Sequence, residues 1–336
     1  MAEFDLIERL AARAGARDDV ALGIGDDAAL LEVPAGEQLV ACCDALNEGV
    51  HFLPGTDPAD IGWKALAVNL SDLAAMGARP AWALLSLSLP RADAGFIDAF
   101  MRGFSALADS AGIALVGGDT TSGPLSVCVT ALGLVPNGRA LTRAGARPGD
   151  AVYVSGTLGD ASAALQNLRT GGAVDDENAR VLLNRMLRPT PRLALGRALR
   201  GHATAAIDVS DGLIADLSHI ARASGVGIEL DADALPASAA LHGWCDPATR
   251  LRHQATGGDD YELAFTLRRD EADALRPAVI CESQAPGERA GGSAISGAVT
   301  RIGRVVAGEG VRVLDASGMP VAFERAGWEH FSENGL

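Results

Sequence analysis

Aspartates that follow short apolar segments are the residues of this 336-residue chain best placed to do chemistry. Four lie just past predicted strands and two more lie in nearby turns: Asp27, Asp44, Asp119 and Asp208, then Asp211 and Asp259. One aspartate at such a place indicates only a turn, because aspartate is a good turn residue. Six of them favour a ligand site, because ligands of open-sheet proteins bind near the carboxyl ends of strands.

Asp72 carries a different signal. It falls on an apolar stripe of a helix predicted over residues 58–77, with Ile61 and Val68 on the same side. A buried carboxylate is costly unless it is paired or binds a metal ion. Because Lys64 is the only lysine of the chain, a metal ion is favoured as the partner, and a structural ion pair with arginine is the alternative.

The chemistry of these side chains predicts a hard cation. Carboxylates without thiolate clusters or paired histidines suit Mg²⁺, which takes part of its ligands from substrate phosphates. An acidic cluster repels a phosphate-bearing substrate unless divalent ions lie between them. The pattern therefore predicts several Mg²⁺ ions that bridge the aspartates and a polyphosphate.

Several familiar motifs are missing. A Walker A loop needs Gly-Lys-Ser/Thr, but the single lysine follows Trp63 inside a predicted helix. Residues 23–28 imitate a dinucleotide fingerprint, yet a strand-like segment follows where that fingerprint needs a helix. Neither H-E-x-x-H nor G-x-S-x-G occurs and the six histidines are scattered, which argues against a zinc enzyme or a serine hydrolase.

Composition excludes further classes. Apolar residues make up 48% of the chain and charged residues 21%, as in globular proteins with a full core. A net charge of −15 without any basic run argues against nucleic acid as a partner. No apolar run approaches the ~20 residues of a membrane helix, and the acidic start is no secretory signal. Five cysteines without a C-x-x-C pair favour a reduced cytoplasm.

Periodic patterns predict the elements that must position these residues. Strands are predicted over residues 20–24, 38–43, 82–89, 113–116, 125–135, 151–155, 203–207 and 261–267. Helices are predicted over 4–14, 58–77, 96–111 and 212–224, and from 160 onward. The polar loop 136–150 separates domains 1–140 and 141–336, and residues 282–297 are interpreted as a mobile loop. The fold class is α/β (α+β) with mixed sheets.

Six motifs, in order along the chain, resemble a known family. They are residues 23–30 (GIGDDAAL), 69–77 (NLSDLAAMG), 117–121 (GGDTT), 139–143 (RALTR), 207–212 (IDVSDG) and 257–263 (GGDDYEL). Together they resemble the thiamine-monophosphate kinase family, bacterial enzymes of the aminoimidazole-ribonucleotide-synthetase-like superfamily, over residues 3–331.

The resemblance implies a two-domain synthetase-like fold. Its N-terminal mixed-sheet domain would bind ATP and Mg²⁺ and pair in a homodimer, beside a C-terminal α/β domain. It also implies ATP-dependent phosphorylation of thiamine monophosphate to thiamine diphosphate. Two alternatives stay open: another ATP-using synthetase of the superfamily, or a non-catalytic Mg-nucleotide-binding homologue. A selenophosphate synthetase would carry a reactive cysteine or selenocysteine and a lysine near the N-terminus, and neither is found there.

The resemblance also assigns roles. The metal positions are Asp27, Cys42, Cys43, Asp44, Asp72, Asp119, Asp208 and Asp211; the ATP positions are Gly118, Asp119, Arg143 and Ser210; the substrate positions are His51, Asp259 and Trp328. From the residues alone, His51 is as easily structural as functional, and Trp328 either stacks on a ligand or belongs to the core. No catalytic acid or base is expected, because a phosphate with a second pKa of about 6 is already largely anionic at pH 7.

Two positions depart from the family pattern. Cys42-Cys43 stand where Ser-Thr is common, which is tolerable if these positions bind metal through backbone carbonyls but weakens one ion if they bind through hydroxyls. Asp259 stands where glutamate is often found, which shortens its reach by one methylene.

Overall fold

The computed structural model describes residues 17–172, 176–268 and 299–329. The chain divides into two compact units, Met1–Leu73 with Ala78–Ala140 and Ala74–Gly77 with Leu141–Leu336. The helix expected over 4–14 and the loop expected over 282–297 lie outside the described residues. Within the described part of the chain, no helix is long and apolar enough to cross a membrane.

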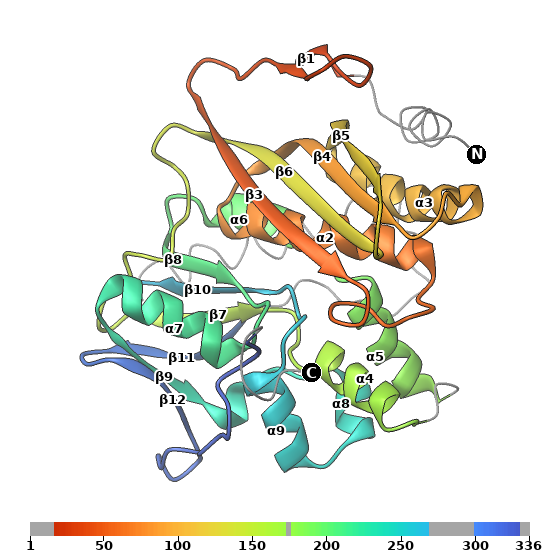
Figure 1. The fold of residues 1–336 in the computed structure, drawn as a ribbon. Helices are drawn as coiled ribbons and strands as arrows, with labels where there is room; N and C mark the ends of the chain where they lie inside the picture. The colour runs from red at the N-terminus through yellow and green to blue at the C-terminus, as the bar shows by residue number, and fades with distance from the viewer. Residues whose placement is uncertain (1–16, 173–175, 269–298, 330–336) are drawn as a thin grey trace, which may run out of the picture. The chain divides into compact units, whose positions relative to one another are not determined.

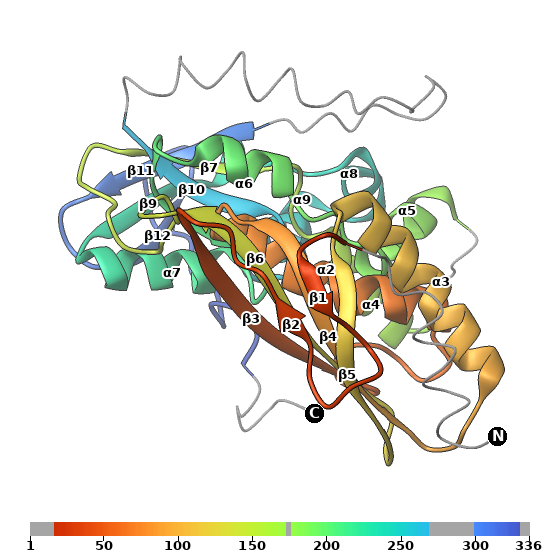
Figure 2. The ribbon, with the colours of Figure 1, turned by 90° about the horizontal axis from the view of Figure 1, so that it is seen from above.

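The first unit is built on a four-stranded mixed sheet (Figure 1). Its strands lie in the order β3 (Glu37–Asn47), β6 (Ser126–Pro136), β4 (Arg79–Leu89) and β5 (Ala114–Ser122). Neighbours pair antiparallel except β4 and β5, which are parallel. Helices α2 (Pro58–Ala75) and α3 (Ala94–Ala111) cover one face, and the ribbon of β1 (Val20–Leu22) and β2 (Leu30–Leu31) packs near Trp82 on the other, as Figure 2 shows.

Helix α2 begins where the sequence predicts. The Asp57 carboxylate accepts the Ala59 N–H at 2.8 Å, and Pro58 takes the first helical position. The apolar side of the helix is buried, but Asp72 is only partly buried. The burial cost that singled out Asp72 in the sequence is therefore smaller than predicted.

Two strands are longer than predicted. β3 runs on to Asn47 because it pairs with β6 at every position, and β5 runs on to Ser122 against β4. The prediction that Asp44 and Asp119 follow strand ends is therefore wrong, since both lie within strands. The apolar pattern stops early, but the backbone ladder continues, because paired N–H and C=O groups need a partner whatever side chain they carry.

Alternation along β3 sends its side chains to two faces. Cys42 and Asp44 point to the helix-covered face, and Cys43 points to the opposite one. We call this second face the open sheet face; it is formed by Leu39, Ala41, Cys43, Ala45, Cys128 and Thr130. Near Trp82 the β1–β2 ribbon packs on this face, whereas along β3 the apolar surface stays exposed within the described part of the first unit, with Leu39 48% exposed.

The second unit contains a six-stranded mixed sheet. The strands lie in the order β12 (Gly310–Leu314), β9 (Gly227–Asp231), β11 (Val299–Val306), β7 (Ala151–Ser155), β10 (Leu263–Leu267) and β8 (Ala203–Asp208). Within this sheet, among the described strands, only the β12–β9 pair is parallel. The helices are α4 (Asp160–Arg169), α5 (Glu177–Leu187), α6 (Leu193–Leu199), α7 (Leu213–Ser224), α8 (Ala239–Trp244) and α9 (Pro247–Thr256), with a 3-10 turn at Ala232–Ala234.

Helices cover both faces of this sheet. Val152, Ile207 and Ala264 pack on one face with Leu213 and Leu217 of α7. A second cluster on the other face joins Phe265, Leu263 and Ala206 to Leu199 of α6. The mixed α/β class predicted from the sequence is confirmed, and β7, α4 and α7 begin at or within one residue of their predicted positions.

Candidate functional site

In the first unit, β3 and α2 bring three predicted metal residues together. Burial raises the pKa of the Cys42 thiol, and the carboxylates of Asp72 and Asp44 raise it further, so the three side chains lie close. The Asn69 amide oxygen, also on α2, accepts the Asp44 N–H at 3.1 Å and fixes helix against strand. Asp44 and Asp72 thus both lie near the Cys42 thiol, on two firmly connected elements.

The donor set at this place suits Mg²⁺ through its carboxylates only. The Cys42 thiol stays protonated and donates to the Asn69 carbonyl at 3.4 Å, which is no ligand for a hard cation. Cys43 lies on the opposite face, where its sulfur is 3.3 Å from that of Cys128. The two adjacent cysteines cannot both offer side chains to one metal ion, so metal binding through their backbone carbonyls is the part of the expectation that stays a prediction.

Asp119 lies apart from this pair. It stands opposite Ser86 in the β4–β5 ladder, on the sheet face away from α2, while Asp44 belongs to the row of Leu85 and Gly118 on the helix face. A pocket of about 520 Å³ is lined by Asp119, Thr120, Thr121 and the cation of Arg91. With Ser122, the lining offers one carboxylate and three hydroxyls, and the Arg91 guanidinium pairs with Asp93 at 3.2 Å.

Gly118 shows why glycine precedes Asp119. Its φ is +153°, and an added Cβ would lie 1.8 Å from the Leu85 carbonyl oxygen. Only glycine allows the backbone of β5 to approach β4 this closely.

Asp27 is exposed between β1 and β2, where its N–H bonds to the Asp26 carboxylate at 2.8 Å. In the described part of the chain, no three carboxylate, histidine or cysteine side chains converge tightly enough to enclose a metal ion. That several Mg²⁺ ions bridge the predicted aspartates and a polyphosphate stays a prediction. Like charges repel without a cation, and Mg²⁺ needs only one or two protein carboxylates when substrate phosphates complete its shell.

Hydrogen bonds hold both the ring and the backbone of His51. Its Nδ1 accepts the Asn47 N–H at 3.0 Å, and its carbonyl accepts from the buried Lys64 ammonium at 3.0 Å. Since Nδ1 is an acceptor, the neutral ring carries its proton on Nε2. Lys64 is committed to this contact, as its place inside a helix predicted.

In the second unit, the loop after β8 carries three predicted residues, Asp208, Ser210 and Asp211. A fourth carboxylate, Asp216 on α7, accepts backbone N–H groups from Ser210, Asp211 and Gly212 at 3.0, 3.1 and 3.1 Å. Burial raises the pKa of Asp216 to about 7, with further increases from Asp208 and Asp211, while the N–H groups of the loop oppose them. Three carboxylates therefore lie around one tight turn.

The predicted acceptor residue Asp259 lies against the same loop. Its N–H bonds to the Ser210 carbonyl at 2.8 Å, and the Tyr261 N–H bonds to the Val209 carbonyl at 2.8 Å. Asp259 has φ +69°, and the Tyr261 hydroxyl donates to its carboxylate at 2.9 Å. A Cβ on Gly258 would lie 2.5 Å from the Ser210 carbonyl oxygen, so the close approach of the two segments requires glycine there.

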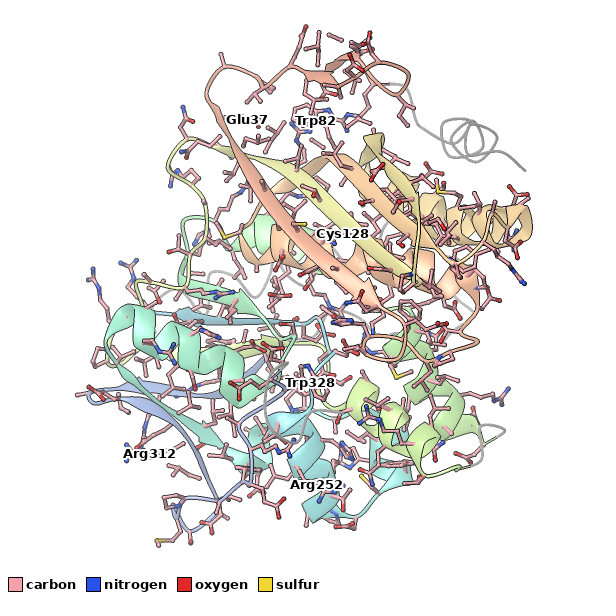
Figure 3. All side chains as sticks on the ribbon, viewed as in Figure 1. Glu37, Trp82, Cys128, Arg252, Arg312 and Trp328 are labelled. Carbon is pink, nitrogen blue, oxygen red and sulfur yellow. The ribbon has the colours of Figure 1, made fainter. Side chains whose placement is uncertain are left out.

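Trp328 joins this assembly through its backbone. Its N–H bonds to the Asp211 carbonyl at 2.9 Å, and its side chain, labelled in Figure 3, is 36% exposed. Of the two interpretations of Trp328 from sequence, a core tryptophan is the poorer fit.

Arg143, a predicted ATP residue, is exposed. Burial lowers the pKa of half-buried His219, and the charge of Arg143 lowers it further. Asp211 raises this pKa and so opposes both effects.

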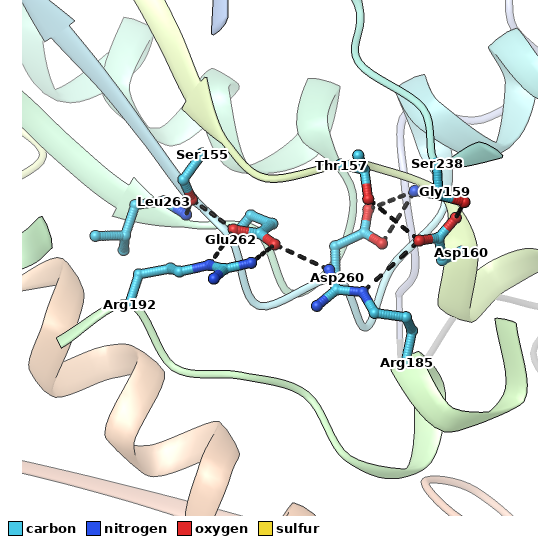
Figure 4. A network of polar contacts seen from close by, with 10 residues as sticks. All are labelled: Ser155, Thr157, Gly159, Asp160, Arg185, Arg192, Ser238, Asp260, Glu262 and Leu263. Atoms are coloured by element: carbon cyan, nitrogen blue, oxygen red, sulfur yellow. Dashed lines mark hydrogen bonds and ion pairs between the residues drawn. The ribbon is translucent and has the colours of Figure 1, made fainter. Parts of the chain in front are cut away.

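A buried polar network anchors the segment that carries Asp259 (Figure 4). Glu262, fully buried, accepts from Arg192 Nε at 2.6 Å, from Arg185 at 2.9 Å and from the Ser155 hydroxyl. Burial raises the pKa of Glu262, but the two guanidinium groups outweigh it and hold the pKa below its usual value. Glu262 is thus a paired, ionised anchor three residues after Asp259.

Asp260 provides a second anchor. Both of its oxygens accept the Gly159 N–H, at 3.0 and 2.9 Å, just before α4. Burial raises the pKa of Asp260 well above its usual value, and Asp160 adds to the shift. The segment is therefore fixed at two positions directly after Asp259.

The sequence analysis missed this supporting set: Asp216, Asp260, Glu262, Arg185 and Arg192. Asp216 carries the signal that singled out Asp72, a carboxylate on an apolar helical stripe with Leu213 and Ile220. The partners of Glu262 lie 70 and 77 residues away in sequence, and no local pattern points to them.

Comparison with known proteins gives consistent matches. Residues 25–135 match the family of the AIR synthase related protein, N-terminal domain, and residues 147–316 match its C-terminal domain. A thiamine-monophosphate kinase of Salmonella typhimurium is 47% identical over 98% of both chains. The structure of a thiamine-monophosphate kinase from Stenotrophomonas maltophilia has 52% identity and a TM-score of 0.83, over 93% of this chain and 96% of that one.

A further solved structure carries ligands. AaThiL complexed with AMPPCP and TMP has 35% identity and a TM-score of 0.76, over 98% of this chain and 96% of that one.

Proposed function

Since this chain belongs to the thiamine-monophosphate kinase family, within the AIR synthase related proteins, we propose that it phosphorylates thiamine monophosphate to thiamine diphosphate with ATP. A phosphate oxygen of thiamine monophosphate attacks the γ-phosphorus of ATP. The bond from that phosphorus to the β,γ-bridging oxygen breaks, and ADP leaves. An ATP analogue and TMP bound together in AaThiL support this pair of substrates.

The contact between Asp259 and Ser210 is the observation that carries the proposal. A residue at a family position for the acceptor substrate donates its N–H to a residue at a family position for the nucleotide, over 2.8 Å. Transfer between two bound phosphate groups needs donor and acceptor to be adjacent and in line. Neighbouring main-chain segments that each serve one substrate meet that requirement.

No general base is needed in this reaction, because the attacking phosphate is already anionic at pH 7. The difficulty is to bring two polyanions together. Mg²⁺ ions supply the charge neutralisation and the template when bound. The residues that would hold them are Asp44 with Asp72, Asp119, Asp27, and Asp208 with Asp211, together with the backbone carbonyls of Cys42 and Cys43.

The remaining roles follow the family positions. Gly118, Asp119, Arg143 and Ser210 contact ATP, with the guanidinium of Arg143 on a phosphate. His51, Asp259 and Trp328 contact thiamine monophosphate. The Nε2 proton of His51 is a donor for an anionic group, and the exposed indole of Trp328 is a stacking surface for a ring.

The domain roles complete the proposal. Residues 1–140 bind Mg-ATP and pair two copies into a homodimer through the open sheet face, and residues 141–336 form the second α/β domain. An apolar sheet surface with Leu39 48% exposed is typical of a face that another protein surface covers. The enzyme acts in the cytoplasm without nucleic acid or membrane partners, as its charge and cysteine pattern favour.

The test is direct. Purified protein is incubated with ATP, Mg²⁺ and thiamine monophosphate, and thiamine diphosphate is followed by chromatography, with free thiamine as the control substrate. Product from the monophosphate alone, abolished by EDTA, supports the proposal. Nucleotide binding without product would favour the non-catalytic alternative, and light scattering on the same sample measures the oligomeric state.

A further inference from the structure

We propose that Asp216 is a positioning residue whose carboxylate holds the Ser210–Gly212 turn in the shape that presents Ser210 and Asp211 to Mg-nucleotide. The inference rests on the proposed function, since it gives a new residue a part in that reaction. Asp216 itself faces the turn and contacts neither substrate in this assignment.

The geometry concerns a single atom. Oδ2 of Asp216 accepts the N–H groups of three consecutive residues, Ser210, Asp211 and Gly212, within 3.0–3.1 Å. The side chain is 3% exposed, so water does not compete for these donors. A carboxylate that accepts several N–H groups makes charge-assisted bonds, stronger than neutral ones. The turn is therefore organised around this oxygen.

Helix capping alone does not account for this arrangement. The N-cap of α7 is Gly212, which has no capping side chain, and Asp216 lies inside the helix, four residues further on. Its carboxylate is 3% exposed, and burial of a carboxylate is costly unless its oxygens are bonded. An ordinary cap reaches only one or two N–H groups and needs no buried carboxylate. The cost of burying the Asp216 carboxylate is explained if the Ser210–Gly212 turn must keep this shape to bind Mg-nucleotide.

The same turn is the base for the acceptor side. The Ser210 carbonyl accepts from Asp259, the Asp211 carbonyl accepts from Trp328, and the Val209 N–H bonds to the Glu262 carbonyl. The peptide N–H groups of the turn go to Asp216 while its carbonyls go to the acceptor segments. Loss of Asp216 thus releases the side of the turn that carries the nucleotide and metal residues.

The experiment compares Asp216→Asn, Asp216→Ala and wild type. Asparagine keeps the size and one acceptor oxygen, whereas alanine removes the acceptor. We measure amide hydrogen exchange in peptides covering residues 209–215, and the dissociation constant of Mg-AMPPCP by calorimetry. Exchange of the turn and the dissociation constant should rise together, about tenfold or more in Asp216→Ala and less in Asp216→Asn.

Asp150→Asn is the matched control. Asp150 is also a buried carboxylate of the second unit, which accepts from the Arg147 N–H and the Thr204 hydroxyl near the start of β8, whereas Asp216 lies by the end of that strand. This variant should lose stability but keep the exchange of the turn and the affinity for Mg-AMPPCP.

Three results would overturn the inference. Unchanged exchange of residues 209–215 in both Asp216 variants would exclude a holding role. Equal loss of affinity in the two variants without faster exchange would mean that Asp216 acts by charge alone. If Asp150→Asn changed the exchange of the turn and the affinity for Mg-AMPPCP as much as the Asp216 variants do, Asp216 would contribute only to general stability. The measurements are nucleotide binding and amide hydrogen exchange, so they test the role of Asp216 even if the wild-type protein forms no thiamine diphosphate. Absence of that product would contradict the proposed function instead.

Discussion

At the scale of single residues, Asp72 is partly exposed and contacts the Cys42 thiol of β3. We expect Asp72→Asn to lower kcat by roughly a hundredfold or more, because it removes a charge placed to hold a cation at the transferred group. The melting temperature should change little, since the side chain is not fully buried. Asp60→Asn, an acidic residue in the first turn of the same helix, is the control and should keep its activity. Wild-type turnover in Asp72→Asn would remove Asp72 from the site.

Tyr261 allows an equally narrow test. Its hydroxyl orients the Asp259 carboxylate over 2.9 Å, so Tyr261→Phe should raise KM for thiamine monophosphate by about threefold to tenfold and leave KM for ATP unchanged. The other tyrosine of the chain, Tyr153, stacks on Phe265 with ring centres 5.7 Å apart, and Tyr153→Phe is the control. Equal KM values in both variants would show that the hydroxyl does not orient Asp259.

The residues accessible from sequence were those with a local signature. Asp72 on its stripe and the Gly-Asp turns stand out because spacing alone marks them. The opposite orientation of Cys42 and Cys43 could also be predicted from sequence, because adjacent residues of a strand face opposite sides of a sheet. That prediction depends on the strand continuing through both cysteines. Partners such as Arg192 and Glu262, 70 residues apart, become neighbours only when the sheet forms.

At the scale of elements, segments with strong periodicity were predicted well, but strand ends were not, and several elements were not predicted at all: α5, α6, α8, α9, β9, β11 and β12. α2, α7 and β7 have strong periodicity and sharp starts, such as Asp57-Pro58. β3 and β5 extend past their apolar runs because neighbouring strands supply hydrogen bonds along their full length. The ligand argument from strand ends therefore holds for Asp208, the last residue of β8, and fails for Asp44 and Asp119.

The junction of β4 and β5 gives a prediction at this scale. Gly118→Ala should destabilise the protein by roughly 2–3 kcal/mol, because the new methyl group meets the Leu85 carbonyl and the strands must separate. Gly36→Ala, where φ is +89° and nothing lies within 4 Å of the added Cβ, isolates the backbone strain and should cost about 1 kcal/mol. Urea unfolding of the two variants measures the difference in their free energies of unfolding. Equal losses of stability would show that β4 and β5 can accommodate the added methyl group.

At the scale of the whole molecule, stability should depend on the pH through His253. Burial lowers the pKa of His253 to about 4 from 6.5, and the charge of Arg252 adds to the shift. Its Nδ1 meets the Ser162 hydroxyl, and its Nε2 is buried without a hydrogen-bond partner among the described residues. Between these two values the unfolded chain binds a proton that the folded chain does not. The stability contributed by neutral His253 is therefore present above pH 6.5 and is lost as the pH falls toward 4.

The variant His253→Gln tests this dependence. Between pH 7.5 and pH 5.0 it should lose roughly 1–2 kcal/mol less unfolding free energy than wild type, because glutamine does not titrate. His242→Gln, an exposed position on α8, should follow the wild-type curve. Parallel curves for wild type and His253→Gln would assign the acid sensitivity to the carboxylates instead.

The main-chain contacts between residues 209–211 and 259–261 have an evolutionary consequence. Hydrogen bonds between peptide groups hold the two segments together, so their side chains can change without separating them. Replacement of Asp259 by glutamate would be one such change: the reach of the carboxylate would differ while the backbone that presents it is kept. Selection can therefore tune acceptor recognition by single substitutions in this lineage without rebuilding the scaffold.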